Sequence, residues 1–151
     1  MNDTTTSIFK AGELALTYRR TEPDGKKVTN PDNLVQTLRD CYGDTIEVME
    51  QAFVIGLSRS NNIRSIFRVS TGGAAGTVID PKIVFSRLLL DNCSAFILSH
   101  NHPSGNRQPS AADKRLTQNF VKAGIALDLP MLDHIIVTTN GSFSFASNNL
   151  M

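Results

Sequence analysis

A short apolar segment, residues 95–98 (AFIL), runs directly into SHNHP (residues 99–103) and, after a loop, into a helix start at Ser110. The apolar segment is bounded by turn signals and predicts a central strand, followed by a loop over residues 100–109. The amphipathic pattern that follows predicts a helix over residues 110–123 that ends at Gly124. Strands that alternate with helices are typical of a mixed sheet with helices on its faces, so the expected fold class is α/β.

The same alternation extends along the rest of the chain. Two hairpins are expected. One joins the predicted strands at residues 52–57 and 63–69, and the other turns at Asn140-Gly141, a strong two-residue turn signal. The helix that opens at Asp80-Pro81 is expected to reach about Asn92 and to bury Ile83, Val84, Leu88 and Leu89. A further helix is expected to open at Asn30-Pro31, and the other expected strands are residues 13–20 (ELALTYRR), 52–57, 63–69, 132–139 and 142–145.

Length and charge limit the possible partners. A chain of 151 residues suits a single domain, and we expect an N-terminal segment with an edge strand (residues 1–29) followed by the domain proper (residues 30–151). The 15 Lys and Arg against 14 Asp and Glu give a charge of +1, which does not support nucleic acid as a partner. No cleavable signal or membrane span is evident, so no membrane partner and a cytoplasmic location are expected.

The histidine pair is the strongest candidate for chemistry. In an extended segment the side chains of His100 and His102 point to the same side, because successive residues alternate. They follow a predicted central strand, where open α/β sheets tend to bind ligands. Ten residues separate His102 from Asp113. Imidazole and carboxylate groups are zinc ligands, and a zinc ion held by three protein ligands keeps one coordination position open for water. The spacing of the two histidines and the aspartate therefore favours a metal site over two histidines in a surface loop.

Asp113 also has a purely structural interpretation. Ser110 at the cap position and an acid three residues later form a near-ideal helix start, which would account for both residues. The two roles are compatible, because an aspartate in the first turn points toward the loop that carries the histidines. We expect Asp113 to be the third ligand, with Ser110 capping the helix and facing the site.

A hydrolytic site would need one more group. Zinc held by two neutral histidines and one carboxylate keeps a positive charge, which lowers the pKa of a bound water to about 7 and polarises a carbonyl. A general base must then take the proton of the water. Glu50, just before the strand at residues 52–57, is the leading candidate, and Glu47 is the alternative. By spacing alone, either could be a solvated surface acid.

These motifs resemble a known family. The spacing His-x-His-x10-Asp, with a serine three residues before the aspartate and a glutamate upstream, resembles the JAMM (MPN+) metalloprotease motif. The stretch HNHPSGNRQPSAAD (residues 100–113), with Asp80-Pro81 before a helix and LDHI (residues 132–135) downstream, resembles the RadC-like branch. The resemblance covers about residues 30–145 and implies a JAB/MPN α-β-α sandwich related to the cytidine-deaminase fold.

The resemblance also implies roles for individual residues. It places zinc on His100, His102 and Asp113. It selects Glu50 as general acid/base, since this residue stands seven positions before the leucine that ends its strand. It implies that Ser110 assists the oxyanion of the tetrahedral intermediate. RadC proteins usually carry a helix-hairpin-helix region before this domain, and with about thirty residues upstream the chain is expected to be the stand-alone form.

Several functions follow as hypotheses. The first is a zinc-dependent metalloprotease or hydrolase acting on a peptide, isopeptide or small amide. The alternatives are a DNA-repair or DNA-processing protein, and a metal-binding module without hydrolytic activity. A nucleobase deaminase is disfavoured, because His-x-Glu and Pro-Cys-x-x-Cys are missing. His134 is not counted as a ligand; it is either a histidine on a strand face or an outer partner of the metal site.

Overall fold

The computed structural model describes residues 25–72 and 78–151; the strand predicted at residues 13–20 lies outside them. Three α-helices and five strands form in the described part of the chain. In order they are α1 (Asp32–Tyr42), the short 3₁₀ helix η1 (Gly43–Thr45), β1 (Gln51–Leu57), β2 (Ile63–Thr71), α2 (Pro81–Leu90), β3 (Ala95–Asn101), α3 (Ala111–Ala126), β4 (Met131–Thr138) and β5 (Gly141–Ser144).

The strands form one mixed sheet in the order β2-β1-β3-β4-β5. β3 and β4 are parallel and are connected through α3, whereas the other neighbours are antiparallel. The central position of β3 explains its apolar sequence, because every residue of this strand is buried. The predicted α/β class, the mixed sheet and both predicted hairpins are confirmed.

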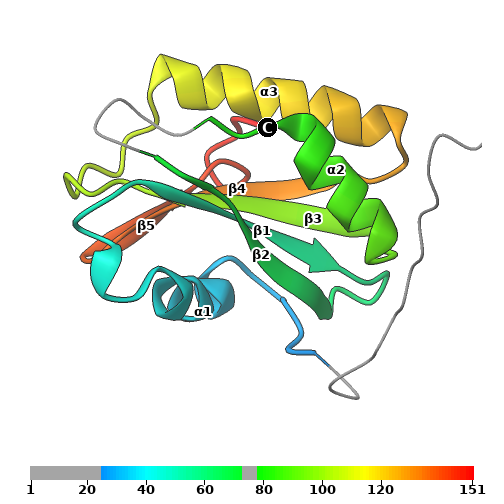
Figure 1. The fold of residues 1–151 in the computed structure, drawn as a ribbon, viewed down its shortest axis with the longest axis horizontal. Coiled ribbons are helices and arrows are strands. Elements are labelled where there is room, and N and C mark those ends of the chain that lie inside the picture. Colours follow the sequence, from blue (N-terminus) through cyan, green and yellow to red (C-terminus); the bar gives the residue numbers. More distant parts are fainter. Residues whose placement is uncertain (1–24, 73–77) are drawn as a thin grey trace, which may run out of the picture.

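Helices cover both faces of the sheet, with α1 on one side and α2 and α3 on the other (Figure 1). Each face has its own apolar core, because side chains alternate along the strands. In β3, Ile97 packs on the α1 side, and Phe96 and Leu98 pack on the side of α2 and α3. The result is an α-β-α sandwich, as the JAB/MPN resemblance implied.

The helices begin where the sequence predicts, because side chains cap them. Oxygens of Asn30, Asp80 and Ser110 each accept a backbone N–H of the following turn, at 2.9, 2.9 and 3.1 Å respectively. None of the helices in the described ranges is both long enough and apolar enough to span a bilayer.

Two predicted element ends are wrong. α3 continues past Gly124 to Ala126, because this glycine allows a close approach rather than ending the helix: a Cβ there would lie 2.6 Å from the carbonyl oxygen of Leu129. β3 does not end at residue 98 but includes His100 and Asn101, which the sequence predicts as loop. Both polar side chains are buried: His100 hydrogen-bonds His134 on β4, and Asn101 donates to the carbonyl of Ile46.

The predicted buried stripe of α2 is partly wrong. Val84 and Leu88 are buried as expected, but Ile83 and Leu89 are 55% and 54% exposed, and Phe85 is buried instead. The Phe85 ring faces inward because it contacts the aromatic rings of Phe96 on β3 and Phe120 on α3.

Candidate metal centre

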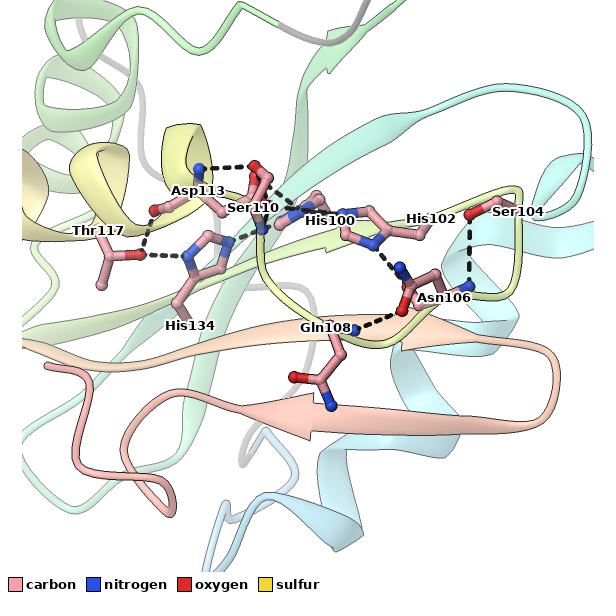
Figure 2. A network of polar contacts seen from close by, with 9 residues as sticks. All are labelled: His100, His102, Ser104, Asn106, Gln108, Ser110, Asp113, Thr117 and His134. Atoms are coloured by element: carbon pink, nitrogen blue, oxygen red, sulfur yellow. Dashed lines mark hydrogen bonds and ion pairs between the residues drawn. The ribbon is translucent and has the colours of Figure 1, made fainter.

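Two imidazoles and a carboxylate converge where β3 ends and α3 begins (Figure 2). One ligand atom from each of His100, His102 and Asp113 lies within 4.8 Å of the others. The Nε2 atoms of the two histidines are 2.9 Å apart. The carboxylate oxygens lie 3.3 Å from Nε2 of His100 and 3.6 Å from Nε2 of His102. The structure therefore brings the three sequence-predicted ligand residues into one cluster.

Asp113 serves the helix and the cluster together. It forms a capping box with Ser110, whose backbone N–H and hydroxyl both donate to Oδ2 of Asp113 at 2.7 Å. The other oxygen, Oδ1, is the one near His100. The helix start thus holds the carboxylate in the orientation that faces the imidazoles, so the structural and functional interpretations of Asp113 do not compete.

The charges in the cluster reinforce one another. Burial would raise the pKa of Asp113, but hydrogen bonds from His100 and His102 in their protonated forms outweigh it and hold that pKa well below its usual range. The pKa of His102 is raised, chiefly by the hydrogen bond to Asp113, with a smaller contribution from the charge of Glu50. An ionised carboxylate therefore faces the two Nε2 atoms, and the site favours a positive charge between them.

A third histidine stands behind the cluster. His134 on β4 is fully buried, with Nε2 2.7 Å from Nδ1 of His100 and Nδ1 2.7 Å from the Thr117 hydroxyl on α3. That hydroxyl donates to the backbone carbonyl of Asp113 at 2.8 Å. Burial, followed by the charge of His100, lowers the pKa of His134 well below its ordinary value, so its ring is neutral.

The direction of these hydrogen bonds fixes which ring nitrogen carries the proton in the neutral form of each histidine of the cluster. Because the Thr117 hydroxyl donates to a carbonyl, it accepts from Nδ1–H of His134. Nε2 of His134 must then accept from Nδ1–H of His100. Nδ1–H of His102 donates to the carbonyl of Asn106 at 2.6 Å. In its neutral form, each of these two rings therefore has its lone pair on Nε2, the atom that faces Asp113.

This donor set fits zinc. Two unprotonated imidazole nitrogens and one carboxylate are a three-ligand set of the kind found in catalytic zinc sites. Each ligand histidine also donates its other N–H to a fixed acceptor, which is the usual arrangement around metal-bound imidazoles. Two lone pairs 2.9 Å apart beside a carboxylate repel one another unless a cation or a proton lies between them.

The two candidate bases lie in different surroundings. Ala52 pairs with His100 across β1 and β3, so continuing that register by two residues brings Glu50 level with His102. Glu50 is half-buried, and its charge acts on His102. Glu47 is exposed and accepts a hydrogen bond at 3.0 Å from a threonine hydroxyl in the β4–β5 turn. The structure therefore brings Glu50, and not Glu47, toward the cluster.

Sequence reasoning missed Thr117 and left two roles open for His134. Thr117 stands four residues after Asp113, so helical spacing alone could have indicated that both face the same side of α3. Of the two roles for His134, the structure gives that of a partner behind His100. No local pattern carries this signal, because the contact joins two parallel strands.

We expect His134→Leu to weaken zinc binding by about 10–100-fold, the usual effect of removing a partner behind a metal-bound histidine. The substitution leaves Nδ1–H of His100 without its acceptor, so the ring loses its fixed tautomer. His134→Gln is the matched variant, because its amide oxygen can still accept that hydrogen bond. Competition with a chromophoric chelator measures the Kd. Equal zinc affinity in wild-type and His134→Leu proteins would contradict this role.

An α-β-α sandwich with a two-histidine, one-carboxylate cluster at the end of its central strand defines a JAB-type domain. A family model described as a RadC-like JAB domain matches residues 28–150, and the chain belongs to this family. The expected coverage of residues 30–145 is thereby confirmed.

Several longer proteins share this domain. A UPF0758 protein of Flavobacterium johnsoniae is 36% identical over 125 residues, which cover 83% of this chain and 54% of that protein. A UPF0758 protein of Salinibacter ruber is 32% identical over 147 residues, covering 96% and 61% respectively. Another, from Chlorobaculum tepidum, is 39% identical over 105 residues, covering 70% and 47%. The chain spans about half of the length of these relatives, whose names state no activity.

Proposed function

We propose that the chain is a zinc-dependent hydrolase of the JAMM type that cleaves an amide or isopeptide bond in a peptide or small conjugate. The observation that supports this most strongly is the convergence of the Nε2 atoms of His100 and His102 on the ionised carboxylate of Asp113, with a second carboxylate, that of Glu50, acting on the same cluster. A site built only to hold a metal would not need that additional acid.

The protein residues divide the work between binding and proton transfer. His100, His102 and Asp113 would hold the ion, and bound zinc supplies Lewis acidity that makes water more acidic and polarises a carbonyl. Glu50 takes a proton from the attacking water as the new C–O bond forms. It then delivers that proton to the amine nitrogen as the C–N bond breaks, so the carboxylate is restored and no co-reactant is required.

Ser110 has a further role in this proposal. Its hydroxyl donates to Asp113 in the structure, at the edge of the cluster. Turned toward the substrate, the same O–H would donate to the carbonyl oxygen as that atom gains negative charge, the role of an oxyanion-hole donor. The backbone N–H of Ser110 continues to hold Asp113 while the hydroxyl turns.

Metal removal tests the proposal directly. We expect the purified chain to bind about one zinc ion and to hydrolyse members of a probe panel of aminocoumarin amides and lysine-isopeptide-linked peptides. A chelator should abolish turnover, and one equivalent of zinc should restore it. Hydrolysis that survives complete removal of metal would contradict the proposal.

The same preparation separates the alternatives. Stoichiometric zinc with every amide of the panel left intact would favour a metal-binding module. Salt-dependent binding to duplex or single-stranded DNA would favour a DNA-processing role. Cleavage of that DNA in a Glu50→Gln variant, with metal removed, would point to chemistry outside this cluster.

A further inference from the structure

The residue between the two ligand histidines points the other way. Side chains alternate along β3, so Asn101 faces the α1 side while His100 and His102 face α3. Its side chain is fully buried. A buried amide must find partners, because an unpaired polar group inside a protein is costly. The partners of Asn101 are all backbone groups of one distant segment.

That segment is the one that carries Glu50. Oδ1 of Asn101 accepts from the backbone N–H of Gln51 at 2.7 Å. Nδ2 donates to the carbonyls of Ile46 and Met49, at 2.7 and 2.9 Å respectively. One side chain therefore binds the residue immediately before Glu50 and the residue immediately after it.

The segment that Asn101 binds lies outside the regular elements. It connects η1 to β1, and residues 46–50 belong to neither a helix nor a strand. The carbonyl of Glu50 itself accepts from the N–H of Gly72, at 2.8 Å, next to the end of β2. Without the Asn101 amide, the Gln51 N–H and two carbonyls would lose their partners at the point where the chain enters the sheet.

We propose that Asn101 is the positioning residue for the general base Glu50, and that it ties the base to the strand that supplies the metal ligands. This inference rests on the proposed function, because it takes Glu50 to be the base. It assigns separate tasks to three consecutive residues: the outer two bind the metal, and the middle one sets where the base stands relative to them.

The test uses Asn101→Asp and Asn101→Ala. The aspartate keeps an acceptor for Gln51 N–H but places a carboxylate beside the carbonyls of Ile46 and Met49; the alanine removes all three bonds. Ser99→Ala is the matched control, since Ser99 is buried on the same face of β3 and its hydroxyl bonds only Tyr42 among the described contacts, at 2.7 Å.

We expect both Asn101 variants to lower kcat by about 100-fold, the cost of misplacing a catalytic group by roughly 1 Å, with the zinc Kd unchanged. Ser99→Ala should retain kcat. In a Glu50→Gln background the Asn101 substitutions should have no further effect on kcat, because a residue that acts through the base has nothing left to position. A zinc Kd that rises in step with the loss of kcat would overturn the proposal.

A second readout does not depend on turnover. In metal-free protein, the Gln51 amide should exchange with solvent faster in Asn101→Ala, which removes its acceptor, and at the wild-type rate in Ser99→Ala. Unchanged protection in Asn101→Ala would overturn the positioning role. If metal-loaded wild-type protein cleaves none of the probes, the proposed hydrolase function fails, and the exchange measurement alone decides whether Asn101 holds this segment.

Discussion

Replacing Glu50 with glutamine is expected to reduce hydrolysis by about 10²–10⁴-fold, the range associated with loss of a general base, while zinc stays bound. Glutamine keeps the size and polarity of the side chain but cannot accept a proton near neutral pH. The proposed metal ligands come from the end of β3, the residue just after it and α3, so their geometry does not depend on the charge of Glu50. The expected result is a metal-loaded protein with lower kcat and little change in KM.

Glu47→Gln provides the matched control. It makes the same chemical change three residues earlier, in an exposed side chain that hydrogen-bonds the β4–β5 turn. We expect this variant to retain both zinc and hydrolysis. Measuring kcat and zinc content in both variants separates the two acids. If Glu47→Gln stops hydrolysis and Glu50→Gln does not, the assignment of the base is reversed.

His100→Ala and Asp113→Ala are each expected to lose stoichiometric zinc. Each removes one of three protein ligands, so the affinity should fall by more than the roughly 100-fold associated with losing an outer partner. Hydrolysis should disappear in parallel. Metal analysis after dialysis against a weak chelator measures this effect, and circular dichroism shows whether each variant remains folded.

Asp113→Ala also removes a helix cap, so its effect needs a matched comparison. Asp80→Ala removes the side-chain cap of α2, which has no contact with the cluster among the described residues. Both substitutions should cost about 1 kcal/mol of stability through the lost cap, and only Asp113→Ala should lose zinc. Zinc that persists at one equivalent in a His100→Ala/His102→Ala double variant would exclude this site.

The fold could be predicted from sequence wherever local chemistry determines it. The cap residues Asn30, Asp80 and Ser110 fixed the helix starts, because an unpaired N–H group in the first turn needs an acceptor that the sequence displays. Element ends were harder. Gly124 has the usual signature of a helix end, but here it allows close packing against a neighbouring backbone, and no local pattern distinguishes these two uses.

Part of the candidate site could likewise be predicted from local sequence, and part could not. The cluster of His100, His102 and Asp113 lies within fourteen consecutive residues, so spacing alone could indicate it. The contacts of His134 and Asn101 join segments far apart in the chain, and they depend on strand register. Asn101 was also hidden by the predicted strand end: in a loop its side chain has no defined direction, whereas in β3 it must point away from the histidines.

Because side chains alternate between the two faces of β3, the polar residues at its end disfavour any other pairing register of the sheet. A shift of one residue between β3 and its neighbours would turn both imidazoles toward α1 and send the Asn101 amide to the opposite face. The misregistered sheet would then bury the two imidazoles and an unpaired amide on the wrong faces. The segment before β1 would lose its hydrogen bonds to Asn101. Such a state carries a large energetic penalty on both faces simultaneously. The polar residues that serve the site therefore also select the correct sheet during folding.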